Sequence, residues 1–425
     1  MSFRTLLALT LLGLAVLVVL QILRPERAAG SGPVAGFDLD DPSVVERGAY
    51  LALAGNCASC HRAPDGASMA GGLAFETPFG TIHATNITPD PETGIGRWTD
   101  RDFLDAMRHG VRPNGDYLYP VFPYTAFTKV TDEDVAAIFA YLRSLPPVRR
   151  QVPENDLAFP FAIRSLMAFW NALFFEAGAF EADPAQPEAW NRGAYLVESL
   201  AHCSACHSPR NLLGAEQQGL AFSGGTYLDR VPGGAHRPWS APNLTASDRG
   251  LGLWSREDLA AYLKHGRNGF LESFGPMNEV IMNSTRHLSG ADIDAMALYL
   301  VGLPAIDEAD GAAPEERILG RGRTVYNLHC GTCHLPTGEG DPEMAPRLNA
   351  GSLVVQSEDP ASMINAILYG PEPPEPPLPP KWRHPMEEFQ YLLDDEEIAA
   401  VATYVRRSWG NAAGVVTAEQ VARQR

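Results

Sequence analysis

The chain has 425 residues, of which 45% are hydrophobic and 20% charged, and its formal net charge is −18 at pH 7. At about 100–150 residues per domain, this length predicts about three domains. The acidic balance argues against nucleic-acid binding and against docking on an acidic membrane through a broad basic face. Any partner is therefore expected to bind through a local patch.

The N-terminal region, residues 1–37, contains an uncharged run rich in Leu and Val at residues 5–23. As a helix this run would be about 28 Å long, close to the thickness of the hydrocarbon layer of a bilayer. A cleaved signal peptide usually has a shorter apolar core followed by an Ala-x-Ala-like site, and no clean site follows Leu23. We therefore expect an uncleaved signal-anchor helix rather than a cleaved signal, with residues 24–37 as a flexible tether.

All six cysteines fall in three Cys-x-x-Cys-His motifs, which are the attachment signature of c-type haem. The two thiols form thioethers with the haem, and the histidine becomes an iron ligand. Zinc would need two Cys pairs around one metal, whereas these pairs lie more than a hundred residues apart. A chain with three such sites is predicted to carry electrons. The motif residues are Cys57, Cys60 and His61; Cys203, Cys206 and His207; and Cys330, Cys333 and His334.

Each motif lies inside a recurring frame. An amphipathic helix with an Arg-Gly pair precedes it, at Arg47, Arg192 and Arg321. A turn-rich stretch follows, with an Asn-x-Thr sequence in the first two instances, and then a helix with a capping-box pattern after Trp98 or Trp254. Each frame ends in a closing helix whose apolar residues recur at helical spacing.

This frame is the class I cytochrome c pattern, so the predicted fold is all-α, with three tandem cytochrome c domains and an N-terminal transmembrane or signal helix. The predicted domains are residues 38–150, 186–305 and 306–425. Residues 151–185 form an aromatic-rich linker. Two interpretations of this linker stay open: a helix packed between the first two domains, or a helix that docks a partner or the membrane surface.

Electron-carrying c-type haems usually take Met as the second axial ligand, from a loop before the closing helix. Met277 and Met386 are the candidates in the second and third domains, each in such a loop beside a proline. In the first domain Phe122 occupies the expected Met position, and phenylalanine cannot bind iron. Three outcomes stay open: a five-coordinate iron, a Met from elsewhere such as Met69 or Met107, or bis-His ligation through His83.

Segments outside the haem motifs are distinctive at residues 77–81, 85–96, 119–124, 191–197, 207–211 and 401–406. With these segments the chain resembles the three-haem cytochrome c subunits of membrane-bound periplasmic dehydrogenases for alcohol, gluconate, sorbitol and fructose. The resemblance covers essentially all of residues 40–425. Family members typically carry Met at the position of Phe122. The variant with Phe122 and an aromatic linker looks more like the cytochrome partners of molybdenum hydroxylases.

The resemblance implies an electron-transfer subunit, not an enzyme. Its expected partners are a catalytic dehydrogenase subunit of molybdenum, flavin or quinone-cofactor type, and ubiquinone or a terminal oxidase as acceptor. Because c-type haem is attached outside the bacterial inner membrane, the domains are expected on its periplasmic face, anchored by residues 5–23. Two alternatives stay open: a peroxidase-like haem enzyme with an open iron in the first domain, and a soluble periplasmic electron shuttle.

Overall fold

The structure is a computed structural model that describes residues 25–27, 33–230, 236–341, 344–371 and 386–425. The chain forms two compact units. Unit 1 comprises the chain up to Ala52 together with residues 60–181, and unit 2 comprises residues 53–59 and 182–425. We call each stretch from an Arg-Gly helix to its closing helix a repeat, numbered one to three. The second and third repeats both lie in unit 2.

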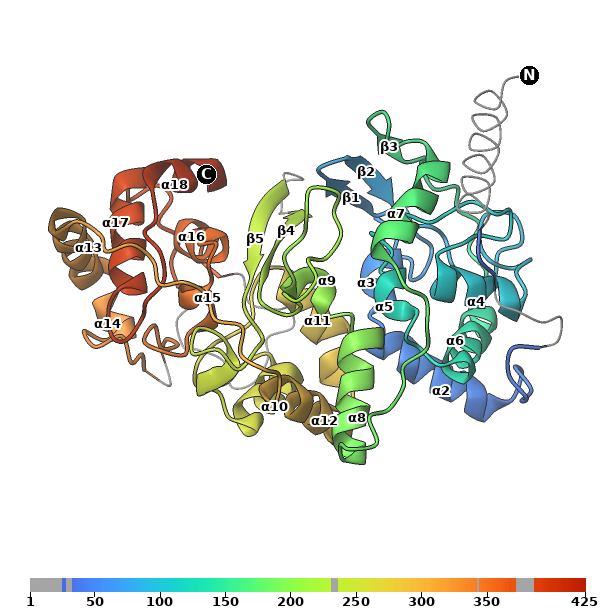
Figure 1. The fold of residues 1–425 in the computed structure, drawn as a ribbon. Helices are drawn as coiled ribbons and strands as arrows, with labels where there is room; N and C mark the ends of the chain where they lie inside the picture. The colour runs from blue at the N-terminus through green and yellow to red at the C-terminus, as the bar shows by residue number, and fades with distance from the viewer. Residues whose placement is uncertain (1–24, 28–32, 231–235, 342–343, 372–385) are drawn as a thin grey trace, which may run out of the picture. The chain divides into compact units, whose positions relative to one another are not determined.

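The described chain is mostly helical (Figure 1). Through the first repeat and the linker, the elements are α2 (Pro42–Ala54), α3 (Cys57–His61), β1 (Ala74–Thr77), β2 (Gly80–His83), α4 (Asp100–His109), α5 (Tyr124–Phe127), α6 (Asp132–Ser144), β3 (Asp156–Leu157), η1 (Arg164–Leu166) and α7 (Met167–Phe174).

The second and third repeats follow in chain order. Their elements are α8 (Glu188–Tyr195), η2 (Leu196–Leu200), α9 (Ser204–His207), β4 (Gly225–Arg230), β5 (His236–Ala241), η3 (Leu251–Leu253), α10 (Arg256–His265), α11 (Pro276–Asn283), η4 (Thr285–His287), α12 (Gly290–Val301), α13 (Glu316–His329), α14 (Gly331–His334), α15 (Leu353–Gln356), α16 (Ala361–Tyr369), α17 (Asp395–Arg406) and α18 (Ala418–Gln424).

The glycine of each Arg-Gly pair lies where the first helix of the repeat crosses the closing helix. A Cβ atom on Gly48 would collide with the Ala137 carbonyl oxygen of α6. The same collision would occur between Gly193 and Ala295 of α12, and between Gly322 and Ala400 of α17. Only glycine lets the two backbones approach this closely, which explains why the pair recurs in all three repeats.

The arginine of each pair binds an acidic side chain near the start of the closing helix. Arg47 lies 2.5 Å from Asp134, Arg192 lies 2.7 Å from Asp292, and Arg321 lies 3.2 Å from Asp394. The Arg192 guanidinium donates from both Nε and Nη2 to the two oxygens of Asp292. Each Arg-Gly pair therefore sets both the distance and the register of the two helices.

The predicted helix starts are confirmed by hydrogen bonds at the N-termini. The closing helices α6, α12 and α17 are capped by the side chains of Thr131, Ser289 and Asp394, each of which accepts a backbone N–H three residues later. The helices α4 and α10 begin with reciprocal capping boxes at Thr99 and Ser255.

The all-α prediction misses short strands. Strands β1 and β2 pair antiparallel, with Phe75 opposite Ile82, and β3 from the linker pairs with β2. A second hairpin, β4–β5, pairs Tyr227 with Trp239. The strands follow from β-branched and aromatic residues joined by tight turns. At Gly80 a φ of 124° and the close approach of β3 both require glycine.

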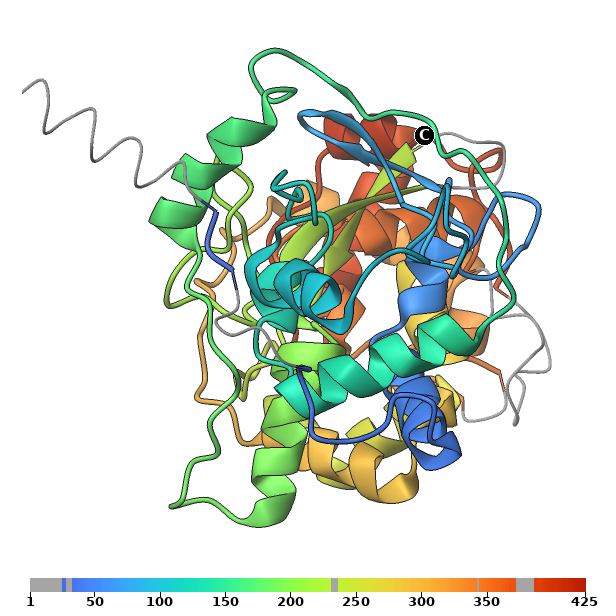
Figure 2. The same cartoon turned by 90° about the vertical axis from the view of Figure 1, so that its right-hand side faces the viewer.

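The linker contains a helix, as predicted, at α7, and it packs against the first repeat within unit 1. Tyr124 donates from its hydroxyl to Asn171 Oδ1 at 2.6 Å, and Tyr119 donates to the Phe161 carbonyl at 2.9 Å. In Figure 2 the chain between α6 and α7 runs along the outer side of unit 1 before it turns into α7. The side chains of Phe159 and Leu173 stay exposed.

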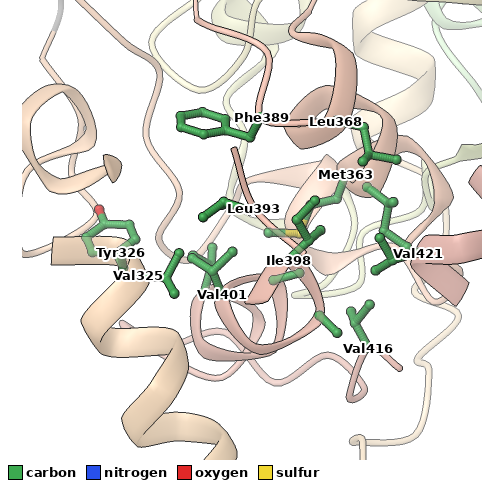
Figure 3. Packing of buried hydrophobic residues seen from close by; sticks show 14 of the residues in the cluster. Val325, Tyr326, Met363, Leu368, Phe389, Leu393, Ile398, Val401, Val416 and Val421 are labelled. Carbon is green, nitrogen blue, oxygen red and sulfur yellow. The ribbon is translucent and has the colours of Figure 1, made fainter. Parts of the chain in front are cut away.

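The third repeat has a core of aliphatic and aromatic side chains between α13, α16, α17 and α18 (Figure 3). Leu368, Ile398 and Val421 are completely buried there. The helices α13 and α17 cross at Gly322 beside this core. Met386 packs against the edge of the core and is partly buried.

Within unit 2, buried polar contacts join the second and third repeats. Ser240 of β5 and Ser362 of α16 exchange three hydrogen bonds of 2.9–3.1 Å between their backbone and hydroxyl groups. Arg249 donates to the carbonyl oxygens of Ala309 and Gln356, both at 2.9 Å, and forms an ion pair with Glu308. The contacts of Arg249 also tie both repeats to the short segment that connects them.

The predicted signal-anchor at residues 5–23 lies outside the described residues. Among the residues that are described, no helix has the length and apolar character needed to cross a bilayer. Described residues of the predicted tether, residues 24–37, make hydrogen bonds to the first repeat. Arg27 donates to the Pro113 carbonyl at 3.0 Å, and the Val34 amide donates to Asp100 at 2.8 Å, so both segments lie against the first repeat.

Candidate haem-binding sites

Each Cys-x-x-Cys-His motif forms or directly adjoins a single helical turn. The turns are α3, α9 and α14. A helical turn places residues three apart on the same side, so both thiols of a pair face one direction and the histidine follows at the end of the turn. No disulfide joins any of the six cysteines, all of which are described. The thiols are therefore available for thioether bonds.

The three motif histidines share one hydrogen-bond geometry. His61 Nδ1 lies 2.7 Å from the Thr85 carbonyl oxygen. His207 Nδ1 lies 2.8 Å from the carbonyl of Pro242, and His334 Nδ1 lies 2.9 Å from that of Pro346. A carbonyl only accepts hydrogen bonds, so Nδ1 carries the proton in each case. Nε2 is thereby left deprotonated, which is the form that binds a metal.

Burial shifts the pKa values of these groups. Burial lowers the pKa of His61, His207 and His334, and the carbonyl hydrogen bond only partly opposes this shift. Burial also raises the pKa of Cys57 to about 11 and that of Cys203 to about 12. The histidines are therefore neutral at physiological pH, as metal ligands must be, and the cysteines do not resemble activated thiolate nucleophiles.

The repeated Asn-x-Thr sequence fixes the carbonyl that orients the histidine in the first two repeats. In the second repeat the buried Asn243 side chain accepts from both the backbone N–H and the hydroxyl of Thr245 and donates to the Ile306 carbonyl. Asn86 makes the equivalent bonds with Thr88 and the Val148 carbonyl. Since each Asn directly follows the residue that supplies the carbonyl, these bonds hold that peptide in place.

These positioning groups were not predicted from the sequence. The repeated Asn-x-Thr was visible, but its hydrogen bonds to Val148 and Ile306 join positions about 60 residues apart. In the third repeat the carbonyl of Pro346 serves without an Asn-x-Thr sequence. There Asn411 donates to the carbonyl of Leu348, two residues further on. The third repeat thus holds the segment that orients its histidine by a different hydrogen bond.

The cysteines and histidines fit a covalently bound haem c. Each repeat offers two thiols on one turn and a neutral imidazole whose Nδ1–H is already committed to a carbonyl. A bound haem supplies an iron centre that takes up and releases one electron reversibly. The protein's contribution is the attachment through the two cysteines and the fixed orientation of the histidine.

Met277 lies in the first turn of α11, not in a loop as predicted, because Pro276 begins a helix there. It is partly buried. The nearby Met282 differs, because its sulfur lies 3.1 Å from Arg286 Nη1. Met386 lies in irregular chain, as predicted, and the residues immediately before it are outside the described part of the chain.

The fold and the three sites define a protein of the cytochrome c class. The cytochrome c family model matches residues 45–146 and 319–409. The chain is 37% identical to the gluconate 2-dehydrogenase cytochrome c subunit of Pantoea cypripedii, over 91% of this chain and 90% of that protein. It is also 37% identical to the cytochrome c subunit of the quinone-dependent alcohol dehydrogenase of Gluconobacter oxydans, over 91% of this chain and 83% of that one.

A further relative is a subunit of the nicotinate dehydrogenase of Pseudomonas putida, which is 41% identical over 86% of this chain. This chain spans only 30% of the length of that protein. The chain belongs to the family of dehydrogenase cytochrome c subunits. Members of this family transfer electrons and are not the catalytic subunits, so the chain is an electron-transfer protein.

Proposed function

We propose that the chain is the electron-transfer subunit of a periplasmic dehydrogenase and binds three c-type haems, one in each repeat. The observation that carries the number three is the histidine–carbonyl hydrogen bond, which recurs at 2.7–2.9 Å in all three. The second repeat has this bond although the family model matches only regions around the first and third motifs. The corresponding domains are residues 38–150, 186–305 and 306–425.

The residues that hold the haems follow from the same geometry. The attachment residues are Cys57, Cys60, Cys203, Cys206, Cys330 and Cys333, and the iron-binding histidines are His61, His207 and His334. Met277 and Met386 are proposed as the second axial ligands in the second and third repeats. In unit 2 the contacts of Arg249 and Ser240 support a fixed spacing between these two haems.

The proposed electron donor is a catalytic dehydrogenase subunit with a molybdenum, flavin or quinone cofactor. The relatives include cytochrome subunits of fructose dehydrogenase and of a quinone-dependent alcohol dehydrogenase, which supports a dehydrogenase as the donor. The proposed acceptor is ubiquinone or a terminal oxidase. Residues 5–23 would anchor the chain on the periplasmic face of the inner membrane. Similarity to electron-transfer subunits does not favour a haem enzyme or a soluble shuttle.

Purification of the full chain from its own membranes tests this function. A catalytic dehydrogenase subunit is expected to co-purify, and its substrate should reduce all three haems, with a haem content of three per chain. A chain that alone oxidised alcohols or aldehydes at dehydrogenase-like rates would contradict the proposal. So would a haem content of two.

Replacing Met277 with leucine is expected to change one haem only. Without the thioether ligand, the second iron should become high-spin and its midpoint potential should fall, because Met ligation raises the potential. Leucine has a similar volume, so the fold should persist. The potentials of the three haems and their electronic spectra are the measurements.

The matched control is Met282→Leu, in the same helix five residues later. The Met282 sulfur already contacts Arg286, so its loss should leave all three potentials unchanged. If Met282→Leu and not Met277→Leu produced the high-spin haem, the ligand assignment in the second repeat would be wrong.

A further inference from the structure

The position of Phe122 in the first repeat corresponds to that of Met277 in the second. Both α4 and α10 end in a left-handed glycine, Gly110 and Gly266, with φ of 64° and 69°. The loop that follows returns to this glycine, because the Leu118 amide donates to the Gly110 carbonyl and the Ser273 amide to the Gly266 carbonyl, both at 2.7 Å. Phe122 and Met277 each come four residues after that anchor.

Met69 does not replace the missing ligand. It lies on the loop that leads from the motif histidine to the orienting carbonyl, with a φ of 59°. Its counterpart in the second repeat is Phe222, with a φ of 65°. The backbone carbonyls of Met69 and Phe222 accept equivalent hydrogen bonds. The donors are the amides of Ile87 and Leu244, the middle residues of the two Asn-x-Thr sequences. Met69 therefore fills a core position on the side of the motif histidine.

Met107 is also a core residue. It lies nine residues after Trp98 in the capped helix α4, and Leu263 lies nine residues after Trp254 in α10. Both side chains are buried, at 5% and 6% exposure. Leucine cannot bind iron, so the equivalent position in the second repeat is a packing position. We infer the same role for Met107.

Besides His61, the first repeat has two histidines, His83 and His109. His83 stands two residues before the carbonyl that orients His61, and Ser240 occupies the equivalent place in the second repeat. His109 is followed by the cap glycine of α4, as His265 is in α10, where Met277 is the proposed ligand. In the linker, Met167 packs on the cluster formed by Val111 and Tyr117.

We propose that the iron held by Cys57, Cys60 and His61 has no protein side chain as its sixth ligand and binds a small neutral diatomic molecule beside Phe122. This inference rests on the proposed haem in the first repeat. The Phe122 ring packs against Phe127 at 5.3 Å between centroids, which gives that position an apolar character. An apolar site favours a neutral ligand over an anion, because burying an unpaired charge is costly.

Carbon monoxide is the probe, added to the reduced full chain purified with its haems. The expected result is one equivalent of bound carbon monoxide per chain, measured from the difference spectrum. In Phe122→Met, the new thioether should occupy the iron and abolish binding. In Met277→Phe, which makes the second repeat resemble the first, two equivalents should bind.

Absence of carbon monoxide binding by the native chain would overturn the proposal. Binding that persisted in a folded Phe122→Met variant while Met277→Phe still bound one equivalent would also overturn it. Haem content is measured on the same samples. A content below three per chain would refute the proposed function, whereas three haems with no bound carbon monoxide would refute the open position alone.

Discussion

Replacing Gly322 with alanine is expected to destabilise the third repeat by about 3 kcal/mol or more, at the upper end of the cost of overpacking. The new Cβ would lie 2.6 Å from Tyr404 Cβ and closer still to the Ala400 carbonyl oxygen. Neither backbone can yield without separating α13 from α17, which pack on the core of that repeat. Calorimetric unfolding of the full chain should show the transition of the third repeat at a lower temperature.

The same helix provides the matched control. Gly320 lies two residues earlier in α13, and a Cβ there would meet no atom within 4 Å. Gly320→Ala should therefore stabilise the repeat by up to about 1 kcal/mol through helix propensity alone. Equal effects of the two substitutions would show that the helix crossing does not require glycine. Gly48 and Gly193 are expected to behave like Gly322.

Replacing Arg249 with methionine is expected to cost about 3–5 kcal/mol, the usual result of removing one partner from a buried ion pair. Its side chain is 8% exposed and that of Glu308 is 11% exposed. The substitution also leaves the Ala309 and Gln356 carbonyls without their donor. The second and third repeats should then unfold in separate denaturant transitions, and residues 306–313 should become sensitive to protease.

A double substitution distinguishes the ion pair from simple loss of packing. Arg249→Met with Glu308→Gln removes the unpaired charge and should recover part of the lost stability. Lowering the pH should also recover part of the stability lost in the single variant Arg249→Met. Burial raises the pKa of Glu308 above its ordinary 4.5, and Arg249 opposes this rise.

The sign of the pH effect follows from that shift. A carboxyl group with a raised folded pKa contributes stability that is complete below the unfolded value and is lost as pH rises through the folded value. Without Arg249 the folded pKa rises further, so the deficit of Arg249→Met should be smaller at pH 5 than at pH 8. An equal deficit at both pH values would mean that Arg249 does not act on the charge of Glu308.

Much of the candidate site was predictable from the sequence, because the chemistry of c-type haem attachment is local. Two cysteines and a histidine within five residues need no distant partner to be recognised. The capped helix starts at Thr99, Ser255 and Asp394 were predictable for the same reason, since a cap is a hydrogen bond over three residues. The strands were harder, because β3 pairs with β2 only after the linker returns to the first repeat.

The Arg-Gly pairs show where local patterns stop being informative. Their repetition marked the frame, but the reason for it is a helix crossing between residues about 80 to 100 apart, such as Gly193 and Ala295. Arg249 gave no signal in the sequence at all. Its role depends on the Gln356 carbonyl, which comes near only when two repeats pack together.

The haem attachment residues, the threefold frame, the family and the departure at Phe122 could all be predicted from the order of the amino acids. The folded chain was needed to show which carbonyls orient the histidines, why glycine follows arginine in each first helix, and where Met69, Met107 and His83 lie. This division arises because covalent attachment and helix capping act over a few residues. Orientation of a ligand, close helix packing and access to an iron depend on segments that folding brings together from distant parts of the chain.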